Sequence, residues 1–189
     1  MISSPKNNQI KNDNWLANSD DNEFLDIVDN NDNVVGQKTR ADIYSEGKSN
    51  FRVINAFIEN TRGQLWVLRR SSQKHYFPLA LDMSVGGHVK SGESYDDAFK
   101  RELLEELKID LSDIQHCLLG YLTPPKNKVS SYMKVYKIFS DKTPQFNTNE
   151  FIEGFWLTPF EIARKINAGE SAKDDLLRLL HIFYRDCSV

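Results

Sequence analysis

Short apolar runs separated by turn residues begin at about residue 23 and continue to the end of the chain. Runs rich in aliphatic, β-branched and aromatic residues predict strands. These runs cover residues 24–29, 34–36, 52–58, 64–70, 82–85, 117–122, 132–139 and 155–157. The Asn- and Asp-rich stretch between the first two runs predicts an N-terminal hairpin.

Apolar residues spaced three and four positions apart predict helices at residues 94–107, 158–167 and 174–185, with a short helical turn at 39–44. Pro159 suits the first turn of its helix, where a missing N–H is harmless. We see no internal repeat. Strands interspersed with helices predict a mixed α/β domain, with helices packed on a mixed sheet. The length of 189 residues suits one domain with a sizeable core, predicted to span residues 23–189.

Residues 1–22 are rich in Asn, Asp, Ser and Lys and lack the apolar segment of a signal peptide, so they predict a flexible tail. Trp15 and Leu16 are expected to be a loosely held apolar pair, with docking on the body or on a second subunit as the alternative.

Composition excludes several classes of function. The net charge of -3 gives no electrostatic case for a nucleic-acid polymer as partner. No apolar run is long enough to span a membrane. Cys117 and Cys187 are too few for a disulfide framework, which predicts a reducing, cytoplasmic location.

Residues 87–109 read GHVKSGESYDDAFKRELLEELKI and carry the candidate chemistry. Gly87 and Gly92 with Ser91 predict a loop, and either Ser91 or Ser94 suits the cap of the following helix. On that helix, Glu102, Glu105 and Glu106 share one stripe of roughly 100°. Carboxylates at this spacing repel one another unless a cation lies between them, and magnesium binds carboxylates, water and phosphate oxygens. The alternative is a solvated charged helix face, which is the usual fate of Glu-rich helices.

The spacing of Gly87, Glu93, Arg101-Glu102-Leu103 and Glu105-Glu106 resembles the Nudix box, and the one departure is Lys108 in place of the final glycine. The resemblance implies a Nudix-type α/β/α sandwich, here with the hairpin as an N-terminal extension, and metal-dependent hydrolysis of a diphosphate linkage. It implies Mg2+, with Mn2+ as a substitute, bound by Glu102, Glu105, Glu106 and the Gly87 carbonyl. It also implies that Arg101 orients a box carboxylate, with Glu93 as its partner.

The resemblance extends to the branch of the family that includes isopentenyl-diphosphate isomerase. The N-terminal hairpin, the Arg69-Arg70 pair, and Lys74 followed by Phe77-Pro78 look like that branch. In the isomerase, an Arg and a Lys at this spacing hold the substrate diphosphate, and they fall here on Arg70 and Lys74. The implied substrate-binding residues are Arg69, Arg70, Lys74 and Phe77. Ordinary surface cations flanking a strand remain the alternative for the basic residues.

The residues that would perform isomerisation are missing. The isomerase requires a Cys just before the box, where this chain has Gly86, and a Glu on a later strand, where residues 130–135 contain no carboxylate. Protonation of an alkene needs a positioned acid and a base on the opposite face. The resemblance therefore favours the fold of this branch without its isomerase chemistry.

The predicted reaction is attack of water on a phosphorus of a small phosphorylated metabolite, with a nucleoside 5′-diphosphate or triphosphate as the best candidate. Nucleotide sugars and isoprenoid diphosphates follow. Glu105 is the first candidate for the general base, and Glu153 and Glu150 are the second, so the predicted catalytic residues are Glu105, Glu153 and Arg101. An isomerase and a non-catalytic nucleotide-binding module remain alternatives. A homodimer is one expected state, because dimers are common among such proteins.

Overall fold

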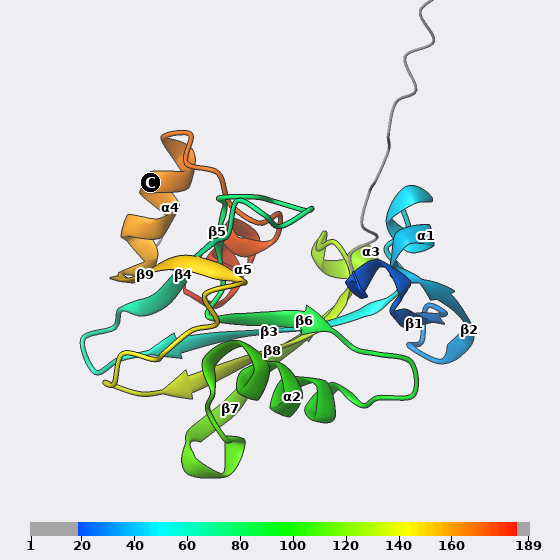
Figure 1. The fold of residues 1–189 in the computed structure, drawn as a ribbon, viewed down its shortest axis with the longest axis horizontal. Coiled ribbons are helices and arrows are strands. Elements are labelled where there is room, and N and C mark those ends of the chain that lie inside the picture. Colours follow the sequence, from blue (N-terminus) through cyan, green and yellow to red (C-terminus); the bar gives the residue numbers. More distant parts are fainter. Residues whose placement is uncertain (1–18, 185–189) are drawn as a thin grey trace, which may run out of the picture.

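A computed structural model describes residues 19–184 (Figure 1). Its strands are β1 (Phe24–Val28), β2 (Val34–Thr39), β3 (Arg52–Glu59), β4 (Leu65–Arg70), β5 (Leu81–Asp82), β6 (Val85–His88), β7 (Gln115–Leu122), β8 (Tyr132–Phe139) and β9 (Phe151–Leu157). Its α-helices are α1 (Arg40–Ser45), α2 (Tyr95–Leu107), α3 (Pro124–Asn127), α4 (Pro159–Asn167) and α5 (Leu176–Phe183). Short 3-10 helices lie at Ser19–Asn22 and Leu111–Asp113.

A mixed sheet of seven strands forms the centre of the molecule. Five of its strands follow one another in the order β5-β4-β3-β8-β7, and the other two, β6 and β9, pair with β3 and β4 respectively. Strands β3 and β8 are parallel, and the other pairs in the sheet are antiparallel. Strand β3 pairs with β4 only at Glu59 and Leu65, because β6 takes the place beside β3 and β9 pairs along β4. The predicted mixed sheet is confirmed.

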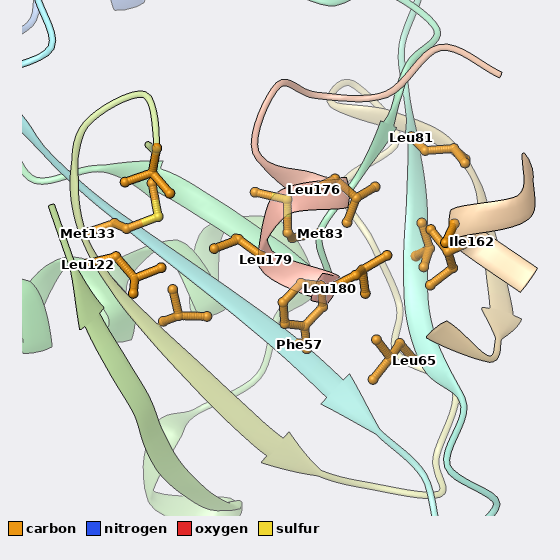
Figure 2. Close-up of a cluster of buried hydrophobic side chains, with 14 residues drawn as sticks. Phe57, Leu65, Leu81, Met83, Leu122, Met133, Ile162, Leu176, Leu179 and Leu180 are labelled. Atoms are coloured by element: carbon orange, nitrogen blue, oxygen red, sulfur yellow. The ribbon is translucent and has the colours of Figure 1, made fainter. Parts of the chain in front are cut away.

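Helices cover both faces of this sheet, because successive side chains of a strand point to opposite faces. Ile54 and Ile58 of β3 pack in a cluster with Leu103 of α2. Phe57, between them, packs on the other face against leucines of α5 (Figure 2). Helix α4 adds Ile162 to the same cluster, and α2 lies on the opposite side of the sheet (Figure 1). The predicted α/β/α layering is therefore confirmed.

The predicted hairpin is present as strands β1 and β2, which form a separate sheet of two strands. With α1 it builds a small core from Leu25, Ile27, Ile43 and Phe51. The Asp26 carboxylate accepts hydrogen bonds from the Ser91 hydroxyl, at 2.8 Å, and from the Gly92 N–H, at 3.1 Å. The extension is thereby attached to the loop that leads into α2.

Several element boundaries differ from those predicted. The single strand expected at residues 82–85 is divided into β5 and β6, because the buried Ser84 hydroxyl donates to the Trp66 carbonyl and accepts from the Ile58 N–H. Residues 123–128 contain α3, and β9 begins at Phe151.

At the N-terminus, Ser19–Asn22 forms a 3-10 helix where a flexible tail was expected. Trp15, Leu16 and Cys187 lie outside the described residues. None of the helices within residues 19–184 has the length and apolar character needed to cross a membrane.

Candidate active site

Helix α2 carries the three glutamates and is held at both ends by local interactions. The Ser94 hydroxyl accepts a hydrogen bond from the Asp97 N–H at 3.1 Å, so Ser94 is the cap of the two serines that the sequence offered. At the C-terminal end, Lys108 adopts a left-handed conformation with φ of 58°. Its N–H bonds to the Leu104 carbonyl at 3.1 Å. Lysine therefore fills the capping position that glycine usually occupies.

A cavity of about 430 Å³ lies beside α2, within the size range of small-molecule sites. Residues from distant parts of the chain line it. They include Glu102, Glu105 and Glu106 of α2; Gly86, Gly87 and His88 of β6; Arg70, Lys74, Tyr76 and Phe77 between β4 and β5; Arg40, Tyr44 and Lys48 of the extension; and Lys173, Asp174 and Asp175 before α5.

Two of the glutamates are buried carboxylates. Burial raises the pKa of Glu106 well above its ordinary value, and the nearby charges of Glu102 and Asp82 raise it further. Burial likewise raises the pKa of Glu102 to about 7, against the opposing effect of Arg101. The Glu106 carboxylate accepts a hydrogen bond from the Gly86 N–H at 3.1 Å. Burial and mutual repulsion both oppose ionisation of these two carboxylates, so a cation beside them would stabilise their charged forms.

Arg101 organises the carboxylates around it. Its guanidinium donates two hydrogen bonds to Glu93, at 2.8 and 2.9 Å, and one to Glu102 at 2.6 Å. A further bond reaches the His88 carbonyl at 2.9 Å. The planar fork of an arginine suits such paired contacts. Arg101 thus contacts Glu93, the partner named from the sequence, and also Glu102.

A model of the NUDIX domain matches residues 50–180. This chain belongs to the Nudix family. It is 57% identical over 164 residues to an uncharacterized Nudix hydrolase of Nostoc sp. (strain PCC 7120), covering 87% of this chain and 97% of that protein. A crystal structure of a Deinococcus radiodurans protein is 46% identical, covers 86% of this chain and 100% of that one, and superposes with a TM-score of 0.82. The prediction of a Nudix hydrolase is confirmed.

The chain is also similar to isopentenyl-diphosphate Delta-isomerase 2 of Photorhabdus laumondii, at 29% identity over 152 residues, covering 77% of this chain and 82% of that protein. The similarity is consistent with the isomerase-like branch of the Nudix family. At the position of the isomerase cysteine, a Cβ added to Gly86 would lie 2.9 Å from Asn55 Oδ1 and 3.1 Å from Lys173 Nζ. These two side chains occupy the space beside Gly86.

Two predicted phosphate-binding residues, Arg70 and Lys74, line the cavity, and each contacts a carboxylate. Arg70 is 7% exposed and donates to Asp82 at 2.7 Å. Burial would raise the pKa of Asp82, but the charges of Lys173 and Arg70 hold it below its usual value. Lys74 forms an ion pair with Glu150, which also lines the cavity.

Arg69 and Glu153, in contrast, lie outside the cavity lining, so the structure does not support the roles predicted for them. They face each other across the β4–β9 pair, with an ion pair at 3.0 Å. Arg69 also bonds Glu170 at 2.7 Å. Of the two neighbouring arginines, Arg70 lines the cavity and Arg69 does not. The position of Glu105 fits the predicted base better, because its half-exposed side chain lines the cavity 3.4 Å from Arg101.

Sequence reasoning missed Lys173 and the extension residues. The Lys173 N–H donates to the Leu81 carbonyl at 2.8 Å, and Ala172 forms a bridge with Leu81, so the backbone holds this lysine beside β5. Its ammonium lies 3.5 Å from the Asp82 carboxylate. No sequence signal marks a lone lysine that lies more than 60 residues after the glutamates.

The donor set fits a divalent cation, which Nudix hydrolases generally need. Gly87 packs so closely on Glu102 that a Cβ there would lie 1.9 Å from the Glu102 carboxylate oxygen. Gly87 and Glu102, both predicted to supply metal ligands, are therefore neighbours in the structure. Within the described part of the chain, no three His, Cys, Asp or Glu side chains are already arranged to hold a metal ion. The carboxylates instead bond to Arg101 and to the Gly86 N–H.

Proposed function

We propose that this Nudix hydrolase cleaves the diphosphate linkage of a nucleoside 5′-diphosphate or triphosphate by attack of water at phosphorus. One observation carries the proposal. A single cavity holds the box glutamates together with the cations Arg70, Lys74 and Lys173. Carboxylates suit a metal ion and cations suit phosphate oxygens, so the two sets together match a metal-bound diphosphate.

In this proposal Glu102, Glu105, Glu106 and the Gly87 carbonyl hold Mg2+, or Mn2+ in its place. The bound ion would neutralise phosphate charge and lower the pKa of the attacking water. Glu105 takes the proton from that water, because it is the most exposed of the three glutamates in the cavity. Arg101 keeps Glu102 in place through the contacts described above.

The substrate side of the proposal uses the remaining cavity residues. Arg70, Lys74 and Lys173 contact phosphate oxygens, and Phe77 packs against the rest of the substrate. Arg69 and Glu153 are left out, because they bond each other outside the cavity lining. An isomerase is disfavoured, because Gly86 stands where its cysteine would lie and residues 130–135 contain no carboxylate.

Release of phosphate and pyrophosphate from a panel of substrates tests the proposal. The panel holds nucleoside diphosphates, triphosphates, nucleotide sugars and isoprenoid diphosphates, each with Mg2+, with Mn2+ and with EDTA. Glu106→Gln should abolish release, whereas Glu59→Gln makes the same change outside the cavity, at a residue bonded to Lys137, and should not. A folded wild type that releases nothing from the panel with either metal would contradict the proposal and favour a binding module.

The proposed partners are small phosphorylated molecules rather than nucleic-acid polymers, in keeping with the net charge of -3. The proposed location is the cytoplasm, in keeping with a chain that has two cysteines, of which Cys117 is free. A homodimer is proposed because dimers are common among such proteins. Light scattering coupled to size-exclusion chromatography tests it.

A further inference from the structure

The N-terminal extension lines the same cavity as the box glutamates, although it precedes the residues matched by the NUDIX model. The model matches residues 50–180, whereas Arg40 and Tyr44 of α1 and Lys48 after it lie before that range. In Figure 1, α1 and the β1–β2 hairpin form a separate group at one end of the sheet. This wall of the cavity is therefore an addition to the matched domain.

Helix α1 is anchored so that two of its residues face the cavity together. Its N-cap Thr39 accepts a hydrogen bond from the Asp42 N–H, and Ile43 is fully buried in the core of the extension. Arg40 and Tyr44 are four residues apart and therefore share one face of the helix. The buried Ile43 fixes the direction of that face.

This face meets a set of aromatic rings. The Tyr44 ring stacks on Tyr76 with centroids 4.5 Å apart, and Tyr76 stacks on His75 at 4.6 Å. The Arg40 guanidinium lies 5.8 Å from the Tyr44 ring centroid and 5.6 Å from that of Tyr76, within the range of a cation–π contact. The contacts hold a planar cation against aromatic surface at the cavity wall.

A short chain of contacts joins this wall to the box. The Tyr44 hydroxyl lies 3.1 Å from His88 Nε2, and the His88 carbonyl accepts a bond from Arg101 at 2.9 Å. His88 directly follows Gly87, whose Cα packs against the Glu102 carboxylate. The aromatic wall and the carboxylates are therefore two ends of one site.

We infer that Arg40 and Tyr44, whose ring is supported from behind by Tyr76, form the subsite for the nucleobase of the substrate. The inference rests on the proposed function and extends it. A base stacks favourably on aromatic rings, and its carbonyl and ring-nitrogen acceptors match the donors of a guanidinium. A hydrocarbon chain fits this wall poorly, because it offers no hydrogen-bond acceptor to the charged side chains of Arg40 and Lys48 that line the cavity.

Calorimetric titration with two non-hydrolysable ligands in the presence of Mg2+ tests the inference. The first kind of ligand is an α,β-methylene nucleoside diphosphate, tried with several bases. The second is methylenediphosphonate, which has no base. Arg40→Met should weaken binding of the best nucleoside analogue about 10-fold and leave methylenediphosphonate unchanged. Lys38→Met is the matched control, because it removes a cation two residues away that does not line the cavity. Tyr44→Leu should also weaken binding of the nucleoside analogue and not that of methylenediphosphonate. It replaces Arg40→Met in the test if Arg40→Met does not fold.

Equal weakening of both ligands would overturn the inference, since the extension would then hold phosphate. Unchanged binding in both variants would overturn it as well, as would a wild type that binds no nucleoside analogue. Hydrolysis is measured separately on the same variants. Base-dependent binding through Arg40 without hydrolysis would support the subsite and contradict the proposed hydrolase reaction. Hydrolysis of a diphosphate without base-dependent binding would support the reaction and overturn the subsite.

Discussion

Gly87→Ala should impair catalysis by displacing one carboxylate while leaving the fold intact. Gly87 lies in β6, paired with Ile54, and its φ is not in the left-handed region. Alanine is therefore compatible with the backbone at this position. The added Cβ would lie 1.9 Å from Glu102 Oε1 and 2.0 Å from its Cδ.

The size of the effect follows from that contact. Ordinary van der Waals contact begins at 3.4 Å, so the Glu102 carboxylate must retreat by about 1.5 Å. A misplacement of about 1 Å at a reacting centre can cost about 100-fold in rate. We therefore expect kcat/KM for the hydrolysed diphosphate to fall about 100-fold, which corresponds to about 2.7 kcal/mol of transition-state stabilisation.

The assay compares Gly87→Ala with wild type and with Gly36→Ala, because a Cβ on Gly36 meets nothing within 4 Å. Steady-state hydrolysis gives kcat/KM, and electron paramagnetic resonance of Mn2+ gives metal affinity without any substrate. Thermal unfolding checks that each variant is folded. If kcat/KM and Mn2+ affinity of Gly87→Ala both stay within about 3-fold of wild type, the prediction is wrong, because Glu102 then does not need its observed position.

Three further predictions concern stability. Asp82→Asn leaves the buried Arg70 without its charged partner, so differential scanning calorimetry should show a loss of about 3–5 kcal/mol at pH 7. Folding lowers the pKa of Asp82 from 3.8, so the stability that its charge contributes is present above that value and is lost as pH falls through the pKa of the folded state. In urea unfolding, the difference in stability between wild type and Asp82→Asn should therefore shrink only below about pH 4. Leu179→Ala should cost about 2–5 kcal/mol by urea unfolding, because this side chain of α5 is fully buried against the sheet. Gly154→Ala places a Cβ 2.1 Å from the ring of the buried Trp66 and should cost about 1–3 kcal/mol, with a change in tryptophan fluorescence.

These stability predictions have clear contrary results. An Asp82→Asn variant as stable as wild type at pH 7 would mean that water or another group solvates the arginine. A small effect of Leu179→Ala would mean that the core beneath α5 collapses around the deletion. Unchanged fluorescence and stability in Gly154→Ala would show that β9 moves away from the tryptophan easily.

The sequence was most informative where a structure depends on neighbours along the chain. The α2 helix was predicted almost to the residue, because the Ser94 cap and the apolar spacing act within one or two turns. The stripe of three glutamates followed from the same geometry. The boundary between β5 and β6 was missed, because it depends on bonds from Ser84 to β3 and β4.

The two neighbouring arginines show where local reasoning ends. The strand pattern alone does not say which of Arg69 and Arg70 lines the cavity, and the pairing of β4 with β9 is irregular between them. Only the pairing of β9 beside β4 gives Arg69 its partner Glu153, and only the packing of β5 brings Asp82 to Arg70. A salt bridge across two strands has no signature in either strand alone.

Most strands and helices, and the box whose carboxylates define the family, could be predicted from the sequence alone. What else surrounds those carboxylates depends on the tertiary packing. Lys173 reaches them from the segment before α5, and Arg40 and Tyr44 reach the same cavity from the extension. The reason is that secondary structure and metal-ligand spacing are set by residues a few positions apart. The walls of a cavity, in contrast, are set by how distant elements pack on the sheet.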